Sequence, residues 1–123
     1  MTREVIIAEY FQMWITKDFS KLTEYFAPEI CYTECYGPQY VGLDEVQQWI
    51  KNESAKQTVL EWQIDEIKSV DNQSFVKWFF KAHEQTTYEF DGVSVIQWNA
   101  EGKISKLDEY QSKSDHIRPY QIK

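Results

Sequence analysis

Residues 90–104 carry the clearest strand and turn signals in the chain and read FDGVSVIQWNAEGKI. The Asp91-Gly92 pair is the strongest hairpin signal, because both residues accept the left-handed backbone that a tight hairpin turn requires. Ala100-Glu101-Gly102 predicts a second turn. Two strands are therefore expected here, over residues 93–99 and 103–111.

Two more strands precede this segment and extend it into an antiparallel meander. Asp71-Asn72-Gln73 predicts a turn into a long strand over about 75–88. Before that turn, apolar and polar residues alternate from Leu60, and the apolar phase slips at Ile67, which indicates a β-bulge. The second half of the chain is thus expected to form four strands.

The first half of the chain predicts mainly helices. Residues 2–15 favour a helix that is apolar on more than one face, with Thr2 as its N-cap. Asp18 is the expected cap of a short second helix, residues 29–36 alternate as a strand, and a third helix begins near Asp44. The expected order is α-α-β-α-β-β-β-β, an α+β domain in which helices cover one face of a curved sheet.

Length, charge and cysteine spacing limit the classes of protein. The 123 residues correspond to one domain, expected over residues 1–113 with a short polar C-terminal tail over 114–123. The 20 acidic and 13 basic residues give a net charge of −7, which argues against a nucleic-acid or anionic-membrane partner. Cys31 and Cys35 would lie about 13 Å apart on one strand, too far for a disulfide. The N-terminus predicts neither a signal peptide nor a membrane span, so we expect a cytoplasmic protein with reduced thiols.

No sequence motif indicates a metal or cofactor. The chain contains no nucleotide-binding loop, no Ser/His/Asp arrangement and no Cys/His spacing typical of zinc. His83 shares its strand face with Lys81 and Gln85, which favours an exposed histidine. We therefore expect no metal and no cofactor.

Several short strings occur in an order and spacing typical of a known superfamily. They are Tyr10-Phe11-x-x-Trp14, Tyr25-Phe26-Ala27-Pro28, the Gly42-Leu43-Asp44-Glu45-Val46-x-x-Trp49 helix, and residues 90–104 followed by Asp108-Glu109-Tyr110. With these strings the chain resembles the nuclear transport factor 2-like superfamily, in its SnoaL-like branch, to about Lys113. The resemblance implies a cone-shaped, cystatin-like, mostly antiparallel sheet wrapped around the long first helix, an apolar cavity at one end, and a homodimer packed through the outer sheet face.

A narrower resemblance, to the ketosteroid isomerases, spans residues 8–37. It places Tyr10 at that family's oxyanion-hole tyrosine and Glu34 at its catalytic carboxylate base. Ser94 falls where the family has a protonated aspartate as the second oxyanion donor, and serine is a hydrogen-bond donor but no strong acid. Asp108 lies near positions where cyclase-type relatives carry an acid. These four residues are the catalytic candidates.

The alternation of residues 29–36 predicts which side chains accompany Glu34. Ile30, Tyr32 and Tyr36 share its strand face, and if that face lines the cavity, burial raises the pKa of Glu34 toward the range of a general base. Asp108 and Glu109 cannot both point inward, because a shift of one residue reverses the face of a strand. The residues expected to line the cavity are Trp14, Ile30, Tyr32, Tyr36 and Trp98.

Three functions are compatible with these residues. The first is a cofactor-independent isomerase, cyclase or hydrolase that uses Glu34 as general base on a small apolar carbonyl substrate, with Tyr10 and Ser94 as oxyanion donors. The second is a non-enzymatic binding protein for a small apolar or aromatic ligand in the same cavity. The third is an association domain whose sheet forms a homodimer. The structural alternatives for the two residues are that Glu34 faces solvent or pairs with a lysine, and that Tyr10 is a core tyrosine.

Overall fold

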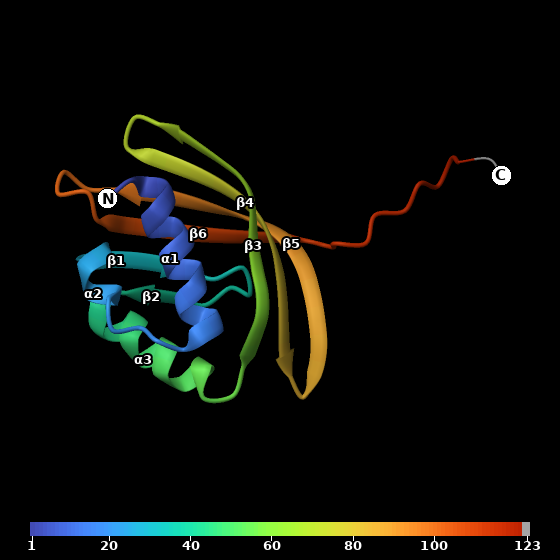
Figure 1. Cartoon of the computed structure of the whole chain (residues 1–123), viewed down its shortest axis with the longest axis horizontal. Helices are drawn as coiled ribbons and strands as arrows, with labels where there is room; N and C mark the ends of the chain where they lie inside the picture. The colour runs from blue at the N-terminus through green and yellow to red at the C-terminus, as the bar shows by residue number, and fades with distance from the viewer. Residues whose placement is uncertain (122–123) are drawn as a thin grey trace.

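Three helices precede or interrupt the strands in the computed structural model, which describes residues 1–121. α1 (Arg3–Thr16) follows Thr2, whose hydroxyl accepts a hydrogen bond from the Val5 N–H at 3.2 Å, so the predicted N-cap is confirmed. α2 (Leu22–Tyr25) is a single turn, and α3 (Leu43–Ser54) packs against the first two strands. Figure 1 shows α2 and α3 on the same side of the molecule as α1.

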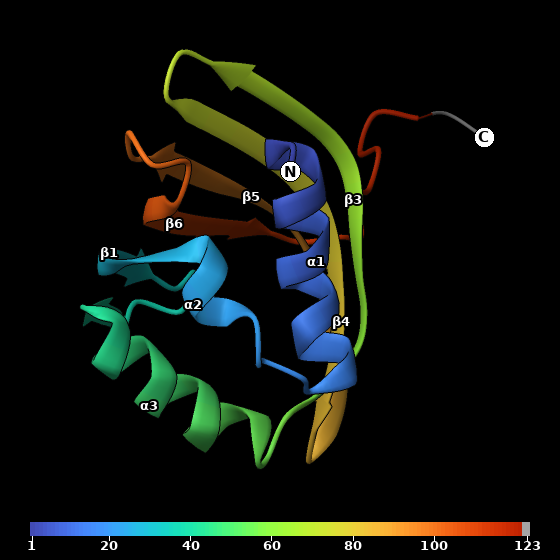
Figure 2. The same cartoon turned by 60° about the vertical axis from the view of Figure 1, so that its left-hand side comes forward.

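Six strands form one curved sheet. In chain order they are β1 (Phe26–Thr33), β2 (Gln39–Val41), β3 (Thr58–Val70), β4 (Gln73–Glu84), β5 (Thr86–Trp98) and β6 (Ile104–Ser112). Their spatial order is β2-β1-β6-β5-β4-β3, and all neighbours are antiparallel except β1 and β6. The long strands bend around α1 (Figure 2), which confirms an α+β fold with a curved, mostly antiparallel sheet around the first helix.

The core lies between α1 and the concave face of the sheet. Along β4 and β5 every second residue is buried, as expected for strands with one covered face. Phe11 of α1 stacks on Trp62 of β3 with ring centroids 3.8 Å apart. The buried residues of α1 lie on more than one face of the helix, as its sequence predicted; they are Ile6, Ile7, Tyr10, Phe11, Met13 and Trp14.

Bulges in β3 contribute to the curvature of the sheet. The pairing of β3 with β4 shifts twice, between Val59 and Glu61 and between Ile64 and Glu66. The second shift lies just before Ile67 and confirms the predicted phase slip. Each bulge adds local twist and bends the strand.

The turn between β4 and β5 lies elsewhere than predicted. The chain turns at Gln85, whose φ is 65°, and Asp91-Gly92 lies inside β5. A Cβ atom at Gly92 would come within 2.2 Å of the Trp78 ring on the paired strand. Gly92 is therefore required for close packing under Trp78 and not for a turn, which corrects the hairpin prediction.

The strand expected over residues 29–36 ends earlier, at Thr33. Glu34 begins the turn that leads into β2, a short strand missing from the predicted order, so the order is α-α-β-β-α-β-β-β-β. The Glu34 N–H donates to the Pro38 carbonyl at 2.9 Å and closes this turn. The predicted turns at Asp71-Asn72 and at Ala100-Glu101-Gly102 are confirmed.

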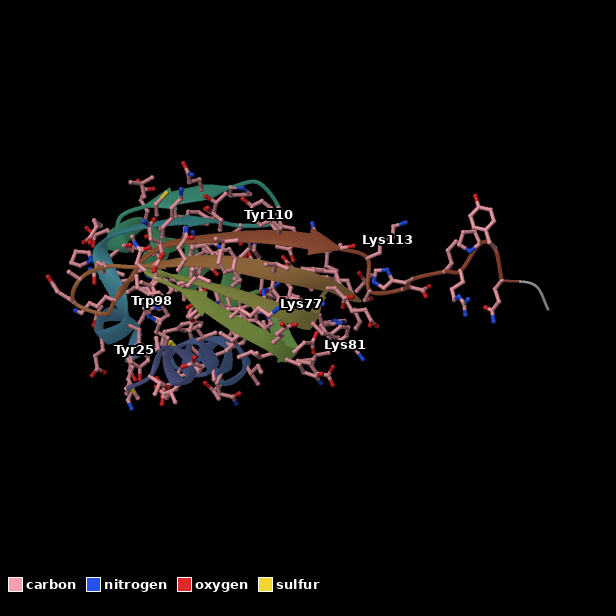
Figure 3. All side chains as sticks on the ribbon, turned by 90° about the horizontal axis from the view of Figure 1, so that it is seen from above. Tyr25, Lys77, Lys81, Trp98, Tyr110 and Lys113 are labelled. Carbon is pink, nitrogen blue, oxygen red and sulfur yellow. The ribbon has the colours of Figure 1, made fainter. Side chains whose placement is uncertain are left out.

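Beyond β6 the chain leaves the body of the domain. Lys113 lies where β6 passes into this segment (Figure 3), and residues 113–121 extend outward without a helix or strand. Within residues 1–121, none of the helices has the length and apolar character needed to span a membrane.

Candidate active site

A cavity lies at one end of the concave sheet face and contacts both α1 and α3. The cavity volume open to a water molecule is about 30 Å³, within an empty space of about 370 Å³ that includes open solvent at the mouth. Four of its twelve lining residues are Glu34, Cys35, Gln57 and Glu109. The other eight are aromatic: Trp14, Tyr32, Tyr36, Trp49, Trp62, Trp78, Phe80 and Phe90. A concave, mainly apolar site with a few polar groups is the usual form of a small-molecule site.

Most of the lining side chains face the cavity because alternate residues of a strand point to the same face of the sheet. Trp78 and Phe80 lie on the inner face of β4, and the register pairs them with Gly92 and Phe90 of β5. Because Gly92 has no side chain, the Trp78 ring covers the backbone there, and the Trp78 N–H donates to Ser94 Oγ at 2.9 Å. The ring is therefore fixed in position by packing and by a hydrogen bond.

Glu109, and not Asp108, lines the cavity. Asp108 lies 3.8 Å from the Lys106 ammonium and takes no part in the cavity wall. The pairing of β5 with β6 shifts beside Ser105, so Ile104 and Leu107 are both buried although they have opposite parity. In a regular strand, alternation from the buried Ile104 would place Asp108 on the inner face. Because Ser105 is an extra residue at the bulge, Glu109 faces inward and Asp108 outward, which corrects the expectation for Asp108.

A chain of hydrogen bonds runs from α1 to Glu109. The Trp14 N–H donates to Tyr10 Oη at 3.0 Å, and Tyr10 Oη donates to Tyr32 Oη at 2.7 Å. Tyr32 Oη in turn donates to Glu109 Oε2 at 2.5 Å. All three donors point the same way, so the chain ends on the one carboxylate. Burial is the main cause that raises the pKa values of Tyr10 and Tyr32 well above their usual value, so both hydroxyls keep their protons.

The carboxyl group of Glu109 holds its proton unusually tightly. Burial, followed by the nearby negative charge of Glu34, raises its pKa to about 8, although the Tyr32 hydrogen bond and a backbone hydrogen bond from Cys35 oppose that rise. Glu109 is therefore mainly protonated at neutral pH.

Glu34 lines the same cavity in a different environment. Its Oε2 accepts a hydrogen bond from Tyr40 Oη at 3.0 Å. Burial raises the pKa of Glu34, while the Tyr40 hydroxyl and the Trp49 indole lower it and Glu53 adds to the rise. The two glutamates thus differ in how firmly they hold a proton, a pattern that often separates the acid from the base in an active site.

No basic side chain balances these two carboxylates. None of the cavity residues in the described chain is Lys, Arg or His. Glu34 and Glu109 are also absent from the ion pairs formed within residues 1–121. Both side chains are half-buried, and a carboxylate partly removed from water without a cation is costly, so a proton or a bound ligand would lower that cost.

Tyr10 and Ser94 lie behind the cavity wall. The single Tyr10 hydroxyl proton is donated to Tyr32, so Tyr10 reaches the cavity only through that residue. The buried Ser94 lies opposite Glu109 in the register, and its oxygen accepts from Trp78. Neither is a lining residue, which corrects the expectation that both face a ligand directly.

The other predicted lining residues divide into two groups. Trp14, Tyr32 and Tyr36 belong to the cavity wall. Ile30 and Trp98 are buried in the core instead, where the Trp98 N–H donates to Ser74 Oγ at 2.9 Å. Alternation along β1 favoured Ile30, but the cavity is at the end of that strand and Ile30 lies too far from it along the chain.

Sequence reasoning missed Tyr40 and Trp49 as neighbours of Glu34. The antiparallel pairing of β1 with β2 sets Tyr40 opposite Tyr32, and Tyr40 stacks on Trp49 of α3 with centroids 4.8 Å apart. The Gly37-Pro38 turn was the available signal, because a tight turn there implies a returning strand. Cys35 turns toward the cavity as a free thiol, and mainly burial raises its pKa to about 12.

Metal ligands do not gather anywhere in residues 1–121: no group of three or more His, Cys, Asp or Glu side chains could hold an ion. His83 is exposed, as predicted, with Nδ1 lying 2.9 Å from Thr87 Oγ1.

Comparison with known families places this cavity in context. Residues 7–107 match the SnoaL-like domain family. The chain belongs to that family. A search of curated proteins found no match. Family membership confirms the superfamily that the sequence strings indicated.

Solved structures of similar fold come from several bacteria. A protein with a ketosteroid isomerase-like fold from Catenulispora acidiphila, crystallised with trimethylamine, is 16% identical, with 91% of this chain and 88% of that one covered and a TM-score of 0.78. A candidate polyketide cyclase from Xanthomonas campestris is 11% identical, with 89% of each chain covered and a TM-score of 0.73. An LEH-like epoxide hydrolase from M. tuberculosis is 11% identical, with 87% and 80% covered and a TM-score of 0.77. At these identities the likeness concerns the fold.

Proposed function

We propose that this protein is a cofactor-independent enzyme that moves a proton on a small carbonyl compound, with Glu34 as general base and Glu109 as general acid. The observation that carries the proposal is the pair of carboxylates in one aromatic cavity without a basic partner. The pKa of Glu109 is about 8, whereas the Glu34 carboxylate accepts a hydrogen bond from Tyr40. Two carboxyl groups with different proton affinities can take the two roles at the same pH.

The proposed step needs only these two groups. The Glu34 carboxylate removes a proton from the carbon next to the carbonyl, and the electron pair moves onto the carbonyl oxygen. Glu109 gives its proton to that oxygen, so the product is an enol and the two glutamates exchange protonation states. Return of a proton to a different carbon gives an isomer, and addition of the enol carbon to an electrophile gives a cyclised product.

One indole N–H group supports a ligand that carries an oxygen acceptor. Trp62 lines the cavity and is 9% exposed. Within the described chain, its Nε1 atom has no hydrogen-bond partner. An unpaired buried donor costs about 1–3 kcal/mol, and a substrate oxygen near this indole would recover part of it.

The test is hydrogen exchange in heavy water, which requires no knowledge of the product. We would incubate butanone, cyclohexanone and acetophenone with the protein in D2O and follow the signals of the protons next to the carbonyl by NMR. We expect faster exchange than in buffer for at least one compound, with the acceleration lost in Glu34→Gln and reduced in Glu109→Gln. Asp108→Asn is the matched control on β6 and should exchange as the wild type does. Acceleration unchanged in Glu34→Gln, or no acceleration with any compound, would contradict the proposal.

Binding without turnover is the second candidate. It is favoured by the hydroxyl groups of Tyr10 and Ser94, which contact other protein groups instead of the cavity. Under this function, ligands would stabilise the fold and no proton exchange would occur.

A further inference from the structure

The aromatic walls of the cavity and its acidic residues favour a positively charged ligand. Its aromatic residues come from α1, α3 and five strands or turns of the sheet, so rings surround the site from several sides. The negative face of an aromatic ring attracts a cation, most strongly where water is excluded. Among the lining residues in the described chain, the two with ionisable acidic or basic side chains are Glu34 and Glu109, and both are acidic.

A cation of a particular kind fits this combination. A metal ion requires several oxygen or nitrogen ligands, and the described chain offers no group of three for it. An anion would meet the negative charge of the Glu34 carboxylate. An alkylated ammonium group presents a positive charge to that carboxylate and methyl groups to the rings, so both features of the wall are used.

We propose that the cavity binds a small alkylammonium compound, with the cationic group between the aromatic side chains and the carboxylate of Glu34. This inference rests on the proposed function, because the alkylammonium compound would be the class of substrate on which Glu34 and Glu109 act. The net charge of −7 favours approach of such a cation. An oxygen on the ligand would in addition meet the unpaired indole N–H group of Trp62.

A pair of isosteric probes separates charge from shape. Choline and 3,3-dimethylbutan-1-ol have the same outline, but a carbon atom replaces the charged nitrogen in the second. Calorimetric titration of the full chain should give choline an affinity about tenfold or more above that of the neutral alcohol. Equal affinity for the two probes, or binding of the alcohol alone, would overturn the inference.

Three variants test the walls and the charge. Glu34→Gln and Phe90→Leu should each weaken choline about fivefold or more and leave the neutral alcohol within about twofold, because one removes a charge and the other a ring. Asp108→Asn, the outward neighbour of Glu109, should bind choline as the wild type does. Circular dichroism verifies that each variant is folded. Choline affinity unchanged in both cavity variants would contradict the inference.

The two proposals fail separately. Choline binding without exchange of any ketone would contradict the proposed proton transfer and support the cation site. Exchange that depends on Glu34, without preference for choline over its isostere, would support the proton transfer and overturn the cation site.

Discussion

The pKa of Glu109 is determined by the groups around its carboxyl group. Tyr32 donates to its carboxylate at 2.5 Å and lowers its pKa, while burial and Glu34 raise that pKa to about 8. We expect Tyr32→Phe to raise the Glu109 pKa further, because the donor is lost while the burial stays. The readout is the titration of the Glu109 carboxyl carbon by NMR. Tyr110→Phe, on the same strand as Glu109 but 61% exposed, serves as control, and a fall in pKa in Tyr32→Phe would contradict this account.

The same pKa predicts how stability depends on pH. The carboxyl of Glu109 titrates near 4.5 in the unfolded chain and near 8 in the native state, so between these values the native state binds more protons. The contribution of Glu109 to stability is therefore fully present below about pH 4.5 and is lost as pH rises through about 8. Urea unfolding at about pH 5 and about pH 9 should show this loss in the wild type and a smaller one in Glu109→Gln. Equal pH dependence in the two proteins would count against a buried, protonated Glu109.

Glu34 makes a second prediction about stability. Burial is the main cause of its raised pKa and adds a free-energy cost to the charged form, and glutamine keeps an oxygen that can accept from Tyr40. We expect Glu34→Gln to stabilise the fold by about 0.5–2 kcal/mol in chemical denaturation near neutral pH. Destabilisation of similar size would mean that the carboxylate makes a structural contact and is not maintained for chemistry.

At this scale the sequence located part of the site. Glu34 and the cavity residues Trp14, Tyr32 and Tyr36 could be named because local spacing and strand alternation bear directly on them. Glu109 could not be assigned, since its direction depends on the unpaired Ser105, which leaves no pattern in the sequence.

At the scale of the elements, Gly92 fixes how β4 and β5 pack. The Trp78 ring occupies the space where a Cβ atom would lie, at 2.2 Å. We expect Gly92→Ala to destabilise the protein by about 1–3 kcal/mol in urea unfolding, because the ring must leave its position and its hydrogen bond to Ser94. In a Trp78→Leu background the same substitution should cost clearly less. Equal costs in the two backgrounds would contradict a direct clash.

The elements were largely predictable, and the errors have local causes. The Thr2 cap, the apolar periodicity and the turn at Asp71-Asn72 are signals within a few residues, so they could be read directly. The expected Asp18 cap was wrong: α2 begins at Leu22 after Lys21, and the Asp18 carboxylate accepts from the Ser20 N–H in the preceding turn. The Asp91-Gly92 turn was misplaced because its glycine is selected by Trp78, which is distant in sequence, whereas the real turn contains the non-glycine Gln85 at positive φ. The short β2 was missed because three residues carry too little periodicity to indicate a strand.

At the scale of the whole molecule, the outer face of the sheet is the expected surface for homodimer formation. Phe75 pairs with Val95 and Val93 with Tyr110, so these four residues form an apolar patch on the face turned away from α1. Figure 3 shows Lys77 and Tyr110 on neighbouring parts of this sheet. The homodimer expected from the resemblance would bury this patch, and we predict a dimer by light scattering that Tyr110→Lys shifts toward the monomer. A wild-type monomer at micromolar concentration would contradict the expectation.

The central claim is that one aromatic cavity holds two glutamates whose carboxyl groups release their protons at different pH values. The most direct measurement is an NMR titration of the side-chain carboxyl carbons in uniformly ¹³C-labelled protein, with Glu34→Gln and Glu109→Gln to assign the two signals. We predict that Glu109 titrates near pH 8, and that Glu34 titrates above its usual value but at a lower pH than Glu109. If both carboxyl groups titrate together near their usual value of 4.5, the cavity does not separate an acid from a base and the account is wrong.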